Sequence, residues 1–311
     1  MYDQSNEMLS TPQLSRIRTF LFGALAVVWF SEMALWGFQS LSAVWTNVWQ
    51  MIPPENPQLA TALSLTHAVE APLKGALGVL AIYGLRSKNP TARTALFLSM
   101  ALVPPLNIAF QFREQGFPAG SVAVATVFTA ILWGSFFLVR EPTEQPEQQG
   151  ATASSQLPPS RGEVLQYGWF AFNSAILTLL ALLFLFWPRA ALDTSLPALS
   201  SLLNTYEGEL SSLIASNLGV GSHLLALATA SWIATAYCRS NPTLRQAVTV
   251  ASTLNAGLMC LLPLRQMGLE FGLSSVLSSI LILFVPLLAG WVLYLAFSHR
   301  VELETPQEAC I

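Results

Sequence analysis

The stretch NPTARTALFLSMALVPPLNIAFQFREQGFPAG, residues 89–120, decides the fold because its pattern occurs twice in the chain. An Asn-Pro-Thr-x-Arg start and an Arg-x-x-Gly-x-x-x-Gly end enclose an apolar run, and residues 241–272 repeat this arrangement without a gap. Restrictive residue types that match at one fixed offset indicate internal duplication, which determines architecture before other signals do. The pattern therefore predicts two equivalent halves. The seven matched positions of the first copy are Asn89, Pro90, Thr91, Arg93, Arg113, Gly116 and Gly120.

The composition indicates that this chain is embedded in a lipid bilayer. Of its 311 residues, 53% are apolar and only 10% are charged, whereas soluble domains carry about 25% charged residues. The net charge of -3 and the lack of a basic run exclude nucleic acid as a partner. The cysteines, Cys238, Cys260 and Cys310, are scattered without a Cys-x-x-Cys spacing, so neither a disulfide framework nor a metal site is expected.

Eight apolar segments are long enough to cross a membrane. About 20 apolar residues span the ~30 Å hydrocarbon core. The sequence therefore predicts an all-α, polytopic bundle of eight transmembrane helices. The predicted spans are residues 19–40, 59–85, 92–112, 118–139, 164–187, 210–238, 244–263 and 273–297.

The lysines and arginines predict how these spans are oriented. At or beyond the ends of the spans, the side that holds the amino terminus carries ten of them, and the other side carries only Arg113, Arg189 and Arg265. Cytoplasmic loops are enriched in Lys and Arg. We therefore expect a plasma or inner membrane protein with both termini in the cytoplasm.

The linker between the halves predicts the domain organisation. Residues 140–162 are rich in Pro, Gln, Glu and Ser, a composition typical of disorder. Each half has an even number of spans, so the two repeats should lie parallel, related by an axis along the membrane normal. The predicted parts are a cytoplasmic tail (1–18), a first four-helix repeat (19–139), a disordered cytoplasmic linker (140–162), a second four-helix repeat (163–298) and a cytoplasmic tail (299–311).

The repeated motif has a structural and a functional interpretation. Asn-Pro-Thr is typical of a helix start, with proline in the first turn. The Gly-x-x-x-Gly steps permit close backbone approach or a tight turn. Arg113 and Arg265 should mark the outer membrane interface, where arginines commonly anchor helices. In the functional interpretation, these two arginines form a symmetric rim that attracts anions.

The first half concentrates the ionisable residues expected inside the membrane, which by default carry a functional hypothesis. Glu32 lies in the first predicted span, and His67, Glu70 and Lys74 lie in the second. The last three are spaced i, i+3 and i+7, so they share one helix face, and Glu70 precedes Lys74 in the favourable i,i+4 order. Pro72 should kink the helix beside these charges.

Two interpretations of these residues remain open. In the first, Glu70 and Lys74 form an ion pair that only fixes helix packing. In the second, Glu32, His67, Glu70 and Lys74 bind a small molecule, an ion or a proton. Asn107 in the third span could complete that site, because Pro104-Pro105 before it frees backbone carbonyls. Most of the nine tryptophans, Trp29 and Trp36 among them, are expected at the interfaces or facing lipid.

The histidines suggest a redox alternative. When Arg86 is aligned with Arg239, Glu70 falls opposite His223, and His67 and His223 lie at nearly the same depth on equivalent helices. Two facing histidines could ligate a haem. No cofactor is otherwise indicated, although haem or quinone fits this alternative.

The sequence thus supports three functions in a stated order. The first is a permease-like or small-ligand-binding membrane protein with a polar site in the outer half of the first repeat. The second is a haem- or quinone-binding redox protein, and the third is a non-catalytic scaffold or assembly factor with a membrane partner subunit. No phosphate loop, Ser-His-Asp arrangement or H-E-x-x-H motif indicates an enzyme.

Overall fold

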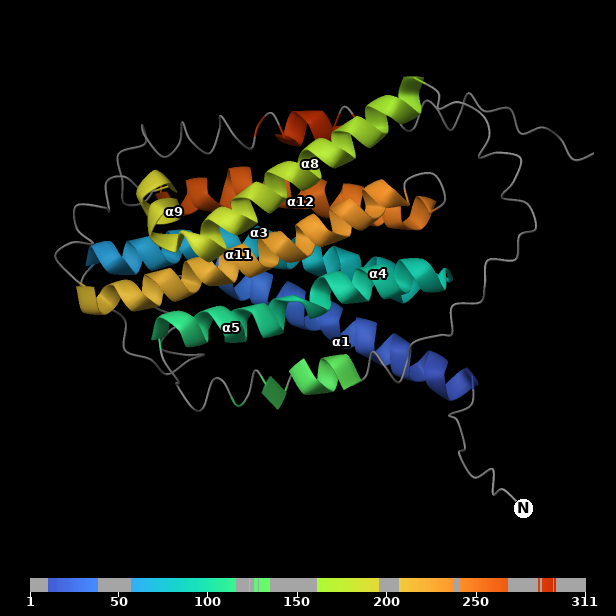
Figure 1. The fold of residues 1–311 in the computed structure, drawn as a ribbon, viewed down its shortest axis with the longest axis horizontal. Coiled ribbons are helices and arrows are strands. Elements are labelled where there is room, and N and C mark those ends of the chain that lie inside the picture. Colours follow the sequence, from blue (N-terminus) through green and yellow to red (C-terminus); the bar gives the residue numbers. More distant parts are fainter. Residues whose placement is uncertain are drawn as a thin grey trace, which may run out of the picture.

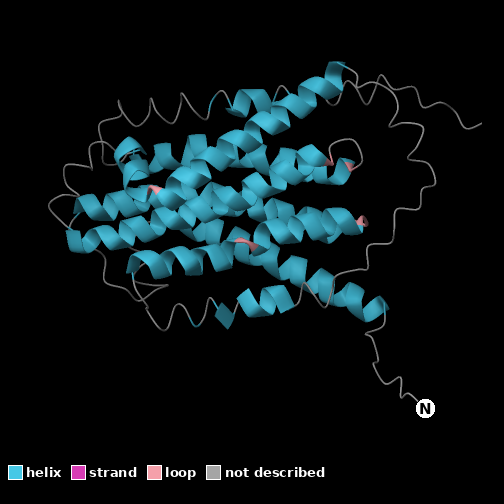
Figure 2. Ribbon diagram, in the orientation of Figure 1, coloured by secondary structure: helices cyan, strands magenta, loops and turns pink. Residues whose placement is uncertain are grey.

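The computed structural model describes residues 11–38, 57–115, 123, 126–127, 129–134, 161–195, 207–237, 241–267, 285, 287–292 and 294. Of this part of the chain 96% is helical and none is strand, which confirms the predicted all-α class (Figure 2). The predicted Gly-x-x-x-Gly steps at residues 116–120 and 268–272 lie outside the described residues.

The helices lie alongside one another in one bundle (Figure 1). Helices α4, α8 and α12 begin, and α3 and α11 end, at the right of the view. Helix α8 begins at Arg161, at the end of the predicted 140–162 linker, and the rest of that linker lies outside the described residues. The helices are α1 (Thr11–Phe38), α3 (Pro57–Arg86), α4 (Pro90–Ala101), α5 (Val103–Gln115), α8 (Arg161–Phe186), α9 (Pro188–Ser195), α11 (Glu207–Ala236) and α12 (Pro242–Met267).

Five of the described helical stretches are long and apolar enough to cross a membrane. They coincide with the first, second, third, fifth and sixth predicted spans. Most of the fourth and eighth predicted spans lies outside the described residues. Helix α12 covers the seventh predicted span and is not among the five. The five stretches are Ser15–Gly37, Thr66–Arg86, Pro90–Ala109, Gln166–Phe186 and Asn217–Ala236.

The two copies of Asn-Pro-Thr begin helices in the same way. The Asn89 side-chain oxygen accepts a hydrogen bond from the Ala92 N–H at 3.0 Å, and the Asn241 side chain accepts one from the Leu244 N–H at 3.1 Å. Each asparagine satisfies one of the amide groups that a helix start leaves without a partner. The predicted helix starts are therefore confirmed.

Two proline sites have different effects on their helices. The third predicted span is interrupted at Leu102, between α4 and α5. Pro104 and Pro105 have no N–H to donate to the carbonyls one turn earlier, so the helix cannot continue regularly there. Helix α3, in contrast, is continuous through Pro72.

Helices α3 and α11 form the centre of the bundle. Helix α3 packs against α1, α12 and α11, and α11 packs against α8, α3, α4 and α5. Glycines let α1 approach α3 closely: an added Cβ at Gly78 would lie 2.9 Å from the Phe30 ring, and one at Gly75 would lie 2.5 Å from Met33 Sδ. This packing turns the polar face of α3 toward both α1 and α11.

Candidate functional site

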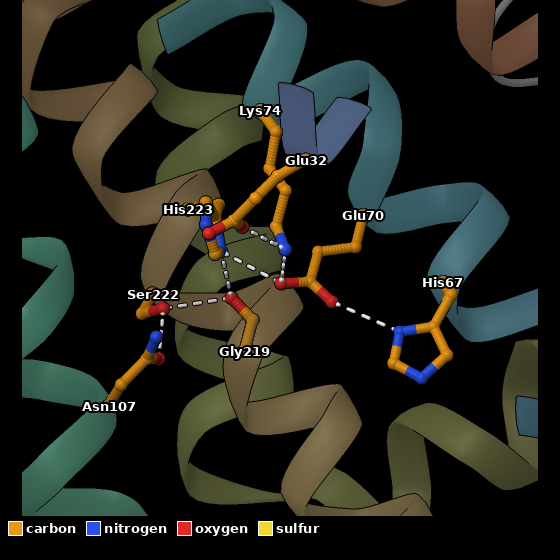
Figure 3. Close-up of polar contacts among 8 residues, drawn as sticks. All are labelled: Glu32, His67, Glu70, Lys74, Asn107, Gly219, Ser222 and His223. Carbon is orange, nitrogen blue, oxygen red and sulfur yellow. Dashed lines mark hydrogen bonds and ion pairs between the residues drawn. The ribbon is translucent and has the colours of Figure 1, made fainter. Parts of the chain in front are cut away.

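The Lys74 ammonium lies between two carboxylates of different helices (Figure 3). Its Nζ is 2.6 Å from Glu32 Oε2 on α1 and 3.2 Å from Glu70 Oε1 on its own helix α3. Only 5% of Lys74 is exposed, whereas 38% of the Glu32 side chain is. The sequence predicted the Glu70–Lys74 pair from its spacing, and the packing of α1 adds Glu32 to it.

The Glu70 carboxylate is the centre of the network (Figure 3). Its Oε1 contacts Lys74 and lies 3.5 Å from His223 Nδ1 on α11. Its Oε2 lies 3.4 Å from His67 Nδ1. Only 7% of Glu70 is exposed. A buried carboxylate is stable only when it is paired and hydrogen-bonded. Glu70 thus connects α3 to α11 directly, and Lys74 extends the network to Glu32 on α1.

The backbone of α11 selects the tautomer of the His223 ring. Its Nδ1 lies 2.6 Å from the Gly219 carbonyl oxygen, and because a carbonyl can only accept, Nδ1 must carry the proton. In the neutral ring, Nε2 is then an acceptor, and within the described residues this buried atom has no hydrogen-bond partner. His223 therefore presents an unused acceptor beside a network of charged groups.

Two tryptophans border this network from α1. Trp36 stacks on the His67 ring at 4.1 Å between centroids and lies 5.4 Å from Lys74 Nζ, within cation–π range. Trp29 contacts His223 edge to face at 5.4 Å and is 6% exposed. The prediction that Trp29 faces lipid or an interface is thus wrong, because α1 turns this ring into the bundle. Nothing in the sequence pattern distinguishes it from a lipid-facing tryptophan.

Asn107 lies at the edge of the site rather than beside Glu70. The hydroxyl of Ser222 lies within hydrogen-bond distance of the Asn107 side-chain oxygen and of the Gly219 carbonyl at 2.8 Å, and these two acceptors share its single proton. Asn107 therefore holds α5 against the turn of α11 that positions His223. Sequence reasoning missed Ser222 and Gly219, since a serine and a glycine in an apolar helix carry no distinctive signal.

The predicted arginine rim stays untested, because the side chains of Arg113 and Arg265 lie outside the described residues. Both arginines are close to the carboxyl ends of their helices, α5 and α12.

The two histidines suggested for haem do not face an open space between them. The Glu70 carboxylate lies between the rings, with one oxygen near each Nδ1 (Figure 3). A porphyrin between axial histidines would need that space, so this arrangement does not fit a haem held by His67 and His223. No cluster of three or more metal-ligating side chains was found in the described part of the chain.

Compared with protein-family models, curated proteins and solved structures, the chain gives no match. Its class therefore rests on its own features. It is an all-helical chain with several helices apolar enough to cross a membrane, as expected of a membrane-embedded protein.

Proposed function

We propose that this protein is a permease-like integral membrane protein that binds a small protonated or amphoteric solute at the Glu70 network. The observation that carries this proposal is the buried Glu70–Lys74 ion pair of α3, which Glu32 of α1 contacts through Lys74 and His223 of α11 contacts through Glu70. Ionisable side chains inside a membrane protein are costly, and those that persist usually mark a substrate or proton pathway.

The charges of the network favour a cationic occupant. With both histidines neutral, two carboxylates face one ammonium, which leaves one net negative charge. The excess carboxylate is the partly exposed Glu32, and a proton or a cationic group that enters this site neutralises it. The partly exposed Glu32 is the point at which such a group reaches the network from the surface of the described helices.

In this proposal, the two halves of the molecule form two parallel four-helix repeats with both termini in the cytoplasm. Helix α1 packs on α3 as α8 packs on α11, and α3 and α11 contact each other at the centre. The repeated asparagine caps and the equivalent alignment positions of Glu70 and His223 support two parallel four-helix repeats that meet at this site. The Lys and Arg bias supports cytoplasmic termini in a plasma or inner membrane.

The competing interpretation is a scaffold in which the charges serve packing alone. A solute screen separates the two: the melting temperature of the detergent-purified protein is measured with amines, amino acids, carboxylic acids and quaternary ammonium salts. The proposal predicts that at least one cationic or amphoteric solute stabilises the native protein by mass action. Glu70→Gln should remove this shift, and Lys88→Met, a change at an exposed lysine, should retain it. Stabilisation that survives in Glu70→Gln would place the site elsewhere, and a scaffold would respond to no solute.

A further inference from the structure

The contacts of Lys74 show which chemical group this site is built to hold. Two carboxylate oxygens lie 2.6 and 3.2 Å from Nζ, and the Trp36 ring lies 5.4 Å away. Carboxylates supply charge-assisted hydrogen bonds to an ammonium, and an aromatic face adds cation–π attraction. The side chain of Lys74 thus serves as a tethered primary ammonium in an ammonium-recognition site.

The site offers more acceptors than Lys74 uses. Each of the two carboxylates has two oxygens, and Lys74 Nζ contacts only one oxygen of each. A buried acceptor left unsatisfied costs about 1–3 kcal/mol, so an occupant that brings N–H donors is favoured here. A quaternary ammonium has no N–H to donate, and an anionic solute would be repelled by the two carboxylates.

The charges balance when one further ammonium enters. Lys74 is closer to Glu32 than to Glu70, and its four-carbon stem is flexible. A second ammonium can therefore pair with Glu70 while Lys74 stays with Glu32, which leaves two positive and two negative charges with both histidines neutral. No residue has to be left with an unpaired charge.

We propose that the solute carries a primary ammonium group. This group binds the Glu70 carboxylate at the position that Lys74 Nζ occupies in this structure. This inference rests on the proposed function, because it names the class of solute that the Glu70 network binds. In this inference Glu70 binds the ammonium of the solute, and the Lys74 side chain moves away from Glu70 when the solute enters.

The test uses the full-length protein with Lys74→Ala, which removes three methylenes and the ammonium. The missing fragment is n-propylammonium, so this ion is the probe. We expect it to raise the melting temperature of Lys74→Ala saturably, with half of the effect at a concentration at least about ten-fold below that of tetramethylammonium, a difference of ~1.4 kcal/mol. Propan-1-ol and sodium chloride at equal concentration should have little effect. If Lys74→Ala does not accumulate in folded form, its folded yield with each additive replaces the melting temperature.

The anchor is tested by adding Glu70→Gln to Lys74→Ala, which should abolish the response to propylammonium. The inference is overturned if folded Lys74→Ala responds equally to propylammonium, tetramethylammonium and sodium. It is also overturned if the response survives Glu70→Gln.

Failure of this inference and failure of the proposed function give different experimental results. If the native protein responds to solutes that lack a primary ammonium and Lys74→Ala ignores propylammonium, the inference alone fails. If propylammonium stabilises Lys74→Ala but no solute stabilises the native protein, the vacated Lys74 position binds an ammonium, but the permease function fails and Lys74 does not yield to a solute.

Discussion

Replacing Lys74 with methionine should be one of the most destabilising single changes in the described helices. Methionine keeps most of the volume and removes the charge that Glu70 and Glu32 share. Glu70 is 7% exposed and would be left buried with only two histidines near it, whereas Glu32 can turn toward its exposed side. Removing one partner of a buried ion pair costs about 3–5 kcal/mol, and we expect Lys74→Met to fall in this range.

A double-mutant cycle of Glu70 and Lys74 shows how much of this loss of stability comes from their ion pair. Glu70→Gln alone should cost less, because Lys74 keeps Glu32 at 2.6 Å. The double variant should be more stable than the sum of the single changes predicts, by about 2 kcal/mol, since neither charge is then left without the other. The assay is reversible unfolding in detergent micelles, followed by loss of helical circular dichroism.

The matched control is Lys88→Met, which removes the same charge from an exposed position and should change stability by no more than about 0.5 kcal/mol. The reasoning is refuted if Lys74→Met costs under about 1 kcal/mol, or if the cycle shows no coupling between Glu70 and Lys74. Either result would mean that these charges reach water or headgroups more easily than their burial indicates.

Three further predictions test the surrounding framework by the same unfolding assay. Gly78→Ala should cost about 1–3 kcal/mol, because its Cβ would press on the Phe30 ring, while Gly168→Ala, with open space around its Cβ, should be neutral or stabilising; equal effects would refute the close approach of α1 to α3. Asn241→Ala should cost about 1 kcal/mol through loss of the α12 cap, and Asn241→Asp should keep most of the stabilisation that the cap provides. An alanine variant with unchanged stability would contradict the capping role. Ser231→Ala should cost about 1 kcal/mol, because it removes the hydroxyl that accepts from Asn173 and from Ser174 on α8; no measurable change would show that water or Thr235 replaces these bonds.

Local signals in the sequence predicted the elements well, for identifiable reasons. Asn-Pro-Thr predicted two helix starts, because the cap depends on residues within a few positions of one another. The i,i+4 spacing of Glu70 and Lys74 predicted their ion pair, since one helix turn determines that distance. Apolar length predicted the five helices that could cross a membrane, while the total of eight spans and the repeat remain predictions.

The contacts between helices could not be derived in the same way. Glu32 lies against Lys74 because of how α1 slides and rotates on α3, and no pattern within either helix specifies this register. The alignment placed Glu70 and His223 at equivalent positions, but their contact follows only from the packing of α3 on α11. Asn107 was expected to support the first-half cluster, yet its partner is Ser222 across the bundle.

Solute-driven proton movement in reconstituted vesicles tests the central claim most directly. Proteoliposomes that contain a pH-sensitive dye are exposed to whichever solute stabilises the native protein most strongly. A permease that binds a protonated or amphoteric solute at Glu70 should change the internal pH when native protein is present and leave it unchanged with Glu70→Gln. Equal signals from both proteins, or no signal from native protein that binds the solute, would contradict the account.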